Sequence, residues 1–222
     1  MIIGIAGQKR SGKDTLAGFI KDNYLGITEP EIISFATPLK NLVCDILSMD
    51  KRHTEGHLKE VIVRTVLPTL DHVRASIKQH LGVCYEDYAI NIHYYLSNQC
   101  NECGNTVVVS YRKAMQYIGT DIFRAAEPNI WLNILGSKLV DGRRYIIPDV
   151  RFENEAAFVR ARGHMIHVVG GGTKKDTHIS EAGLPVLPCD LQVENNVGLA
   201  KLKAEAARVL CQLITGGKNS GK

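Results

Sequence analysis

The chain lacks the features of a membrane protein, a secreted protein or a strongly basic nucleic-acid binder. No apolar run approaches the roughly 20 residues that a membrane-spanning helix needs, and no signal peptide precedes the first apolar stretch. The balance of 27 basic and 23 acidic residues gives a net charge of only +4, which does not favour nucleic acid as a partner. Six cysteines without a secretory signal indicate reduced thiols. We therefore expect a cytoplasmic protein with no membrane or nucleic-acid partner.

The length fits one domain. A chain of 222 residues can bury a substantial core, and no internal repeat is visible. We predict a single domain over residues 1–215 and a flexible tail over 216–222, where the sequence becomes small and polar.

The N-terminal segment has the pattern of a phosphate-binding loop. An apolar run at 2–6 is followed by a loop bounded by Gly7 and Gly12, then by Lys13 and a helical pattern. The glycines allow a tight turn with inward N–H groups, and the helix start adds positive charge. Lys13 would reach the β- and γ-phosphates. We predict an ATP-binding site formed by Gly7, Ser11, Gly12, Lys13, Asp14 and Thr15.

Two details of this loop depart from the general pattern. Asp14 occupies the position where Ser or Thr usually binds Mg²⁺, and Thr15 follows it. A carboxylate can bind Mg²⁺ directly or through water, or it could contact the acceptor or an arginine. Lys9 and Arg10 indicate more anionic charge than one triphosphate supplies, although a solvated charged loop is the alternative.

A second acidic signal follows a later strand. The apolar run 144–148 leads to Asp149, which resembles a carboxylate that holds Mg²⁺ and its water shell. Arg151 lies two residues further on, where a guanidinium can stabilise a transferring phosphoryl group. An ordinary surface ion pair is the alternative. We predict a metal site formed by Asp14, Thr15 and Asp149, and a catalytic role for Arg151.

Basic residues recur between these two signals. Lys40 falls in the first turn of a helix that Pro38 begins, after a strand at 31–36. Arg112 and Arg124 flank a helical block at 111–124, broken at Gly119-Thr120. The only tryptophan, Trp131, starts the next helix and is either core or a flat wall for a base. The predicted substrate-binding residues are Lys9, Arg10, Asp14, Lys40, Arg112, Arg124 and Trp131.

The segment at about 49–110 reads as an insertion. Residues 58–67 and 70–81 have helical patterns, and four tyrosines fall within 85–95. Cys100 and Cys103 form a C-x-x-C knuckle, but structural zinc needs four ligands and no second pair exists. We therefore interpret the pair as reduced thiols in a tight turn, not as a zinc site.

The C-terminal half alternates strands and helices. A helix at 152–162, a strand at 164–169, a glycine-rich lid-like loop at about 170–183, a strand at 190–194 and a final helix at 197–214 follow in order. We therefore predict an α/β fold of three αβα layers, with a mainly parallel sheet and a helical and β insertion.

The blocks GQKRSGKDT, SFATPLK, QYIGTDIFR, IIPDVRFENEA and HISE, with the late turn VENN, resemble those of phage-type deoxynucleoside monophosphate kinases. In this order they cover nearly the whole chain except about 49–110. The resemblance implies a P-loop fold of the nucleoside monophosphate kinase type, ATP as co-substrate and Mg²⁺. It also implies a homodimer. For a phage protein it implies a location in the cytoplasm of the host cell.

The resemblance also assigns roles. It places Lys13 and Thr15 on the ATP phosphates, and the catalytic set it implies is Lys13, Arg151, Asp149 and Arg10. It implies phosphorylation of deoxynucleoside 5′-monophosphates for DNA synthesis. The acceptor oxygen is already anionic, so we nominate no catalytic base.

Two other functions stay open at this point. The run Lys-Arg-Ser-Gly-Lys-Asp also resembles animal phosphomevalonate kinases, although the GTDIFR and DVRFENEA blocks favour the first family. From a different class, the chain could be a nucleotide-regulated nucleic-acid binder with a zinc-ribbon-like module at Cys100 and Cys103. The small net charge and the lack of a second C-x-x-C argue against this.

Overall fold

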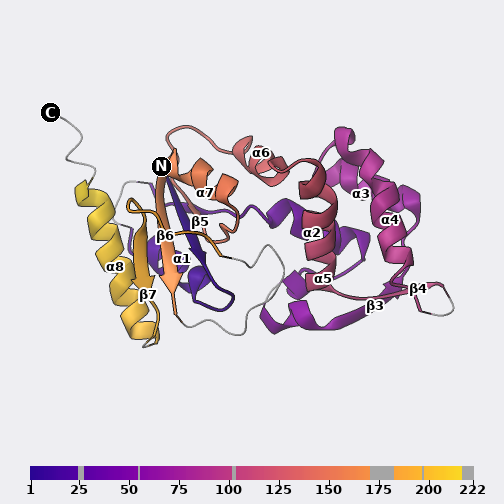
Figure 1. Ribbon diagram of the computed structural model, residues 1–222, viewed down its shortest axis with the longest axis horizontal. Coiled ribbons are helices and arrows are strands. Elements are labelled where there is room, and N and C mark those ends of the chain that lie inside the picture. Colours follow the sequence, from indigo (N-terminus) through magenta and orange to yellow (C-terminus); the bar gives the residue numbers. More distant parts are fainter. Residues whose placement is uncertain (25–27, 55, 102–103, 171–182, 197, 217–222) are drawn as a thin grey trace. The chain divides into compact units, whose positions relative to one another are not determined.

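The chain folds into two compact units. The computed structural model describes residues 1–24, 28–54, 56–101, 104–170, 183–196 and 198–216. Unit 1 consists of residues 1–35 and 138–222, and unit 2 of residues 36–137 (Figure 1). Unit 2 therefore extends beyond the predicted insertion at 49–110 on both sides.

Unit 1 is built on a five-stranded sheet. Its strands, in the spatial order β2-β5-β1-β6-β7, are all paired in parallel. The central strand β1 is apolar along its whole length and almost entirely buried, as expected for a strand covered on both faces. The strands are β1 (Ile2–Gly7), β2 (Glu31–Ile32), β5 (Tyr145–Ile147), β6 (Gly163–Val169) and β7 (Leu191–Glu194).

Helices cover both faces of this sheet. Helices α1 (Lys13–Asp22) and α8 (Leu199–Gly216) share one core with Ile3, Ile5 and Ile166. On the other face lies α7 (Glu153–Arg160), close to β1 (Figure 1). A Cβ at Gly4 would lie 2.7 Å from Val159 Cγ1, so glycine allows this close approach. The predicted α/β fold with a parallel sheet is confirmed.

The order of the strands determines where a ligand can bind. The chain leaves β1 toward β2 on one side and leaves β5 toward β6 on the other, so β1 and β5 flank a topological switch point. In such sheets ligands bind beyond the carboxyl ends of the strands at this point. The loop after β1 and the loop after β5 both emerge there, because Gly4 is paired with Ile147.

Unit 2 contains mostly short helices and one two-stranded ribbon. Strand β3 pairs with β4 in antiparallel register, with Arg64 opposite Val108. The elements are α2 (Thr37–Ile46), η1 (Lys51–Thr54), η2 (Gly56–Glu60), β3 (Ile62–Val66), α3 (Leu70–His80), η3 (Val83–Tyr88), α4 (Ala89–Ser97), β4 (Thr106–Ser110), α5 (Tyr111–Gln116), η4 (Tyr117–Arg124) and α6 (Ile130–Gly136).

One helix prediction in unit 2 is wrong. Residues 58–67 form a short 3₁₀ turn and then strand β3, because β-branched residues dominate 62–66 and pair with the valines of β4. The helix predicted for 70–81 is confirmed as α3. Its first turn is capped by Thr69, whose hydroxyl accepts a hydrogen bond from the His72 amide.

The block at 111–124 also differs from the prediction of a break at Gly119-Thr120. Helix α5 continues directly into η4, which is a π-helix through Arg124. Ile118 and Phe123 face the core of unit 2 and are fully buried. Gly119 contacts Leu39 so closely that a Cβ would overlap the leucine side chain. The glycine therefore permits helix packing instead of ending the helix.

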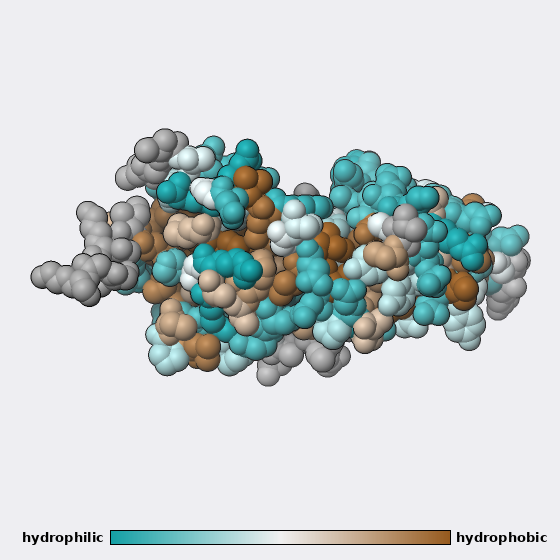
Figure 2. All heavy atoms as spheres, turned by 90° about the horizontal axis from the view of Figure 1, so that it is seen from above, coloured by the Kyte–Doolittle hydropathy of each residue, from teal (hydrophilic) through white to brown (hydrophobic). Residues whose placement is uncertain are grey.

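The remaining predicted elements that lie in the described residues are present with somewhat different bounds. The strand expected at 31–36 is only β2, and the strand expected at 144–148 is only β5. The predicted lid at 170–183 lies outside the described residues except at its two end glycines, as does the tail beyond 216. In the described part no helix is long and apolar enough to cross a membrane, and Figure 2 shows polar residues interspersed with small apolar patches.

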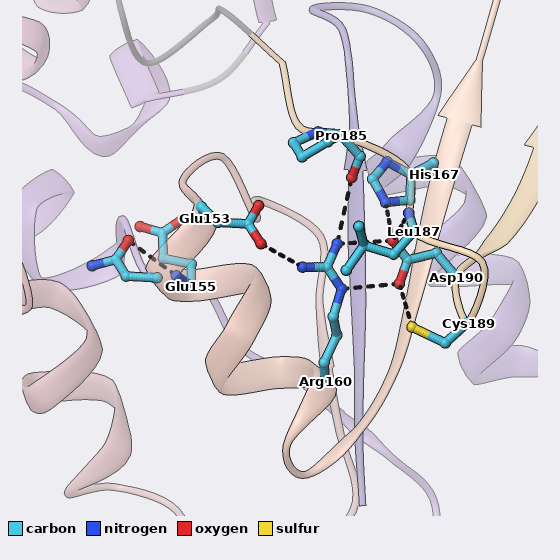
Figure 3. A network of polar contacts seen from close by, with 9 residues as sticks. Glu153, Glu155, Arg160, His167, Pro185, Leu187, Cys189 and Asp190 are labelled. Atoms are coloured by element: carbon cyan, nitrogen blue, oxygen red, sulfur yellow. Dashed lines mark hydrogen bonds and ion pairs between the residues drawn. The ribbon is translucent and has the colours of Figure 1, made fainter.

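A buried ion-pair network joins three elements of unit 1 (Figure 3). The Asp190 carboxylate accepts hydrogen bonds from Arg160 Nε at 3.0 Å and Arg160 Nη2 at 2.8 Å. The Leu187 amide donates to the same carboxylate at 2.9 Å, and His167 Nε2 contacts it at 3.0 Å. Arg160 also donates to Glu153 at the start of α7. The network therefore fastens α7 to β6 and to the segment before β7.

The ionisation of Asp190 depends on this network. Burial by itself would raise its pKa, but hydrogen bonds from Arg160, the Leu187 amide and His167 outweigh it and keep the pKa well below its usual range. The folded form therefore binds fewer protons than the unfolded chain near pH 4. Its stabilising contribution is present above the ordinary carboxyl range and is lost as the pH falls below it.

We predict that Asp190→Asn lowers the unfolding free energy by about 3 kcal/mol at pH 7, because it removes one partner of a buried pair. The difference from wild type should shrink at pH 3, measured by urea unfolding at both values. Asp71→Asn is the control, because Asp71 forms an exposed pair with Arg74. An equal loss at both pH values would contradict the account.

Candidate active site

The loop after β1 has the backbone of a phosphate cradle. Gly7, Arg10 and Gly12 all have positive φ, of 153°, 62° and 93°. A Cβ at Gly7 would lie 2.6 Å from the Val168 carbonyl oxygen, so only glycine fits against β6. The loop ends at the N-terminus of the ten-residue helix α1, where backbone N–H groups and the helix dipole favour an anion.

Ser11 and Asn195 define the interior of the loop. Ser11 is fully buried, and within the described residues its hydroxyl has no hydrogen-bond partner. The Asn195 side-chain amide, from the turn after β7, donates to the Ser11 carbonyl at 2.9 Å. The same amide nitrogen lies 2.7 Å from where a Cβ on Gly12 would be. The loop is thus fixed from a distant part of the sequence.

Lys13 lies folded back over the loop. Its Nζ donates to the Gly7 carbonyl at 2.7 Å and to the Gln8 carbonyl at 2.6 Å. Asp14 and Thr15 follow in the first turn of α1, and both are exposed. The ammonium group and the backbone N–H groups of the loop are therefore provided by one short segment, as a triphosphate requires.

Asp149 joins the ends of β2 and β5. One carboxylate oxygen accepts a hydrogen bond from Ser34 Oγ at 2.6 Å, and the other accepts from the Phe35 amide at 3.1 Å. The following residue, Val150, donates its amide to the Ile5 carbonyl of β1 at 3.3 Å. This bond extends the pairing of β1 with β5 beyond the regular strand. Asp149 is therefore fixed at the same sheet edge as the phosphate cradle.

Arg151 is positioned through its backbone. The buried Glu155 carboxylate accepts from the Arg151 amide at 2.9 Å and from the Phe152 amide at 3.2 Å. Glu155 lies in the first turn of α7, where a carboxylate is favoured by the helix dipole. The turn from Asp149 to Phe152 therefore has two carboxylate anchors, and Arg151 lies between them.

Four of the seven predicted acceptor residues lie in unit 2, and the other three, Lys9, Arg10 and Asp14, lie in unit 1. The Lys40 carbonyl accepts from Tyr111 Oη at 3.2 Å, and burial raises the pKa of Tyr111 so that it stays a donor. Arg112 Nε donates to Glu60 at 2.6 Å, and Arg124 Nη1 donates to the Pro128 carbonyl at 3.1 Å. A phosphate that binds Arg112 would therefore compete with Glu60.

Trp131 packs as a core residue. It is only 4% exposed, its Nε1 donates to the Gly119 carbonyl at 3.0 Å, and its ring meets Phe123 edge-on at 5.7 Å between centroids. In this conformation the indole offers little surface on which a base could stack. These contacts agree with the alternative that Trp131 is a core residue. That Trp131 contacts a nucleotide stays a prediction.

Some predicted features fall outside the described residues. Cys103 is one of them, while the Cys100 thiol donates to the Leu96 carbonyl at 3.5 Å. The HISE block at 178–181 is another. The described residues contain no group of three His, Cys, Asp or Glu side chains that could hold a metal ion.

The described residues fit ATP and Mg²⁺. Ser11, with its buried unpaired hydroxyl, and the positive-φ turns of the loop suit phosphate oxygens. Mg²⁺ typically uses one or two carboxylates together with substrate phosphates and water. Asp149, Thr15 and Asp14 are the predicted oxygen ligands. The bound ion would neutralise charge on the phosphates.

Three positioning residues were not among the predicted site residues. Ser34 and Glu155 hold the turn around Asp149, and Asn195 holds the phosphate loop. Glu155 stands three residues after the N-cap position, but Phe152 at that position lacks the side-chain oxygen of a capping box, so the sequence carries no clear signal for it. The contacts of Ser34 and Asn195 span 115 and 184 residues of sequence and depend on the sheet order.

Comparison with known proteins identifies relatives over most of the chain. A family model described as deoxynucleotide monophosphate kinase matches residues 58–206, about two thirds of the chain. The deoxynucleotide monophosphate kinase of Enterobacteria phage T4 is 28% identical, covering 94% of this chain and 98% of that protein. The corresponding protein of Escherichia phage RB69 is 26% identical, covering 94% and 99%. The deoxynucleoside-5′-monophosphate kinase of Escherichia phage T5 is 26% identical, covering 92% and 94%.

We predict that Lys13→Ala abolishes turnover while leaving the thermal unfolding midpoint nearly unchanged, because the side chain lies on a loop, where its ammonium donates to the Gly7 and Gln8 carbonyls. Lys21→Ala, in the last turn of the same helix, is the control and should keep wild-type activity. If Lys13→Ala retains more than about a tenth of the activity, a deficit below roughly 1.4 kcal/mol, Lys13 does not act on the phosphates.

Proposed function

Because the chain belongs to the deoxynucleotide monophosphate kinase family, we propose that it transfers the γ-phosphoryl group of ATP to a deoxynucleoside 5′-monophosphate. The products are the diphosphate and ADP. The observation that best supports this reaction is the shared sheet edge of the phosphate loop and Asp149, fixed by the pairing of β1 with β5. Phage relatives fit a role in deoxynucleotide supply in the cytoplasm of an infected cell.

The residues of unit 1 account for the donor side of the reaction. The loop from Gly7 to Lys13 binds the ATP phosphates, and Arg10 adds charge at the loop. Asp149 is assigned to the Mg²⁺ water shell. Arg151 stabilises the charge that spreads over the transferring group, since a planar guanidinium can contact two of its oxygens.

The acceptor side is assigned to basic residues of unit 2 and of the loop. Lys9 and Arg10 lie in the phosphate loop and Asp14 in the first turn of α1. Lys40, Arg112 and Arg124 supply further positive charge. The acceptor phosphate oxygen is anionic at neutral pH, so in-line attack requires no general base. Catalysis then consists of positioning and charge neutralisation.

A substrate panel tests this assignment. ADP release is measured with ATP, Mg²⁺ and each of dTMP, dGMP, dCMP, dAMP, their ribose counterparts and phosphomevalonate. We expect turnover with one or more deoxynucleotides and none with phosphomevalonate. Turnover with phosphomevalonate alone would favour the other small P-loop kinase family instead.

We predict that Arg151→Lys lowers kcat by at least about tenfold with little change in the KM for ATP, because lysine keeps the charge but loses the planar fork. Arg143→Lys, at an exposed arginine of the same unit, is the matched control. Steady-state kinetics of both variants give kcat and the KM for ATP and so test this prediction. An unchanged kcat for Arg151→Lys would reduce Arg151 to a structural ion pair.

A further inference from the structure

The π-helix η4 is the least expected element of unit 2. It spans Tyr117–Arg124 and continues α5 without interruption. A π-helix bonds residue i to i+5 and is rare, because the α-helix is the more favourable arrangement of the same residues. It therefore persists only where surrounding side chains stabilise it.

The π register determines the direction of Arg124. Each α-helical residue turns the chain by about 100°, so a one-residue change of register rotates the side chains beyond it by a similar angle. Arg124 is the last residue of η4 and is itself a candidate for the acceptor phosphate. If η4 relaxed to an α-helix, its guanidinium would face another direction.

Aromatic side chains from the segment at 83–97 contact η4 at two places. The Tyr95 ring stacks on Tyr117 with centroids 3.8 Å apart and ring planes 11° apart. Tyr88 and Tyr85 lie against the buried Phe123, at 5.1 and 6.3 Å. The three tyrosines come from η3 and α4, and α4 packs beside η4.

Two polar contacts add to this packing. Trp131 donates its indole N–H to the Gly119 carbonyl in the middle of η4. Tyr85 Oη donates to Glu127 at 3.1 Å, three residues beyond Arg124. Burial and the neighbouring carboxylate raise the pKa of Tyr85 to about 12, as expected for a hydroxyl that donates to a carboxylate. We call Tyr85, Tyr88, Tyr95 and Trp131 the aromatic cradle.

We propose that the aromatic cradle holds η4 in its π register and thereby sets the direction of Arg124, the residue assigned to the phosphate of the deoxynucleotide, whose guanidinium here donates to the Pro128 carbonyl. Tyr95 and Tyr85 are then positioning residues for the acceptor, and the segment at 49–110 serves substrate binding through them. This inference rests on the proposed function, because it takes Arg124 as a contact of the acceptor. It also gives Trp131 a role in supporting η4 that does not require a nucleotide base to stack on its ring.

Tyr95→Leu removes the stack on Tyr117 and tests the inference. We expect the KM for the deoxynucleotide to rise roughly threefold to tenfold, the size of one aromatic pair, with the KM for ATP within about twofold of wild type. Tyr95→Phe keeps the ring and should restore wild-type values. Tyr94→Leu is the matched control, because the neighbouring Tyr94 ring is 67% exposed.

Tyr85→Phe is a second variant that tests the inference and leaves the ring packing intact. It removes only the bond to Glu127 and should raise the same KM by about twofold or more. Two results would show that the aromatic cradle is only structural and overturn the inference. One is an equal change in the KM values for the deoxynucleotide and for ATP, and the other is a lower unfolding temperature with both KM values unchanged. A wild-type chain inactive on every deoxynucleotide would overturn the proposed function and the inference with it.

Discussion

The parallel pairing of β1 with β5 is the constraint on which the candidate active site depends. It places the phosphate loop and the turn after β5 at one sheet edge, and the bond from Val150 to the Ile5 carbonyl continues it past the strands. The pairing is stable because β1 is buried on both faces. Without it, Lys13 and Asp149 would belong to unrelated surfaces.

Both units hold their candidate functional groups through contacts made elsewhere. In unit 1, Ser34, Glu155 and Asn195 fix backbone turns while the reactive groups themselves stay on loops. In unit 2, the aromatic cradle packs against the π-helix η4 that ends at Arg124. Preorganisation of this kind limits the reorganisation needed during phosphoryl transfer.

The sequence predicts the elements around the phosphate loop well and those of unit 2 less well, for a physical reason. The phosphate loop and the strand ending near Asp149 are local patterns, so residues 2–15 and 144–151 suffice to recognise them. The strand at 62–66 was missed because its pairing with β4 joins segments some 40 residues apart. The burial of Trp131 and the π register of η4 depend on packing in three dimensions, which periodicity does not encode.

The most direct test of the account follows the phosphoryl group itself. ATP labelled at the γ-phosphorus is incubated with the protein, Mg²⁺ and an accepted deoxynucleoside monophosphate, and the labelled products are separated. The account predicts that the label appears in the deoxynucleoside diphosphate, at its terminal phosphate, in a one-to-one ratio with ADP. Label released only as inorganic phosphate would show an ATPase and contradict the central claim.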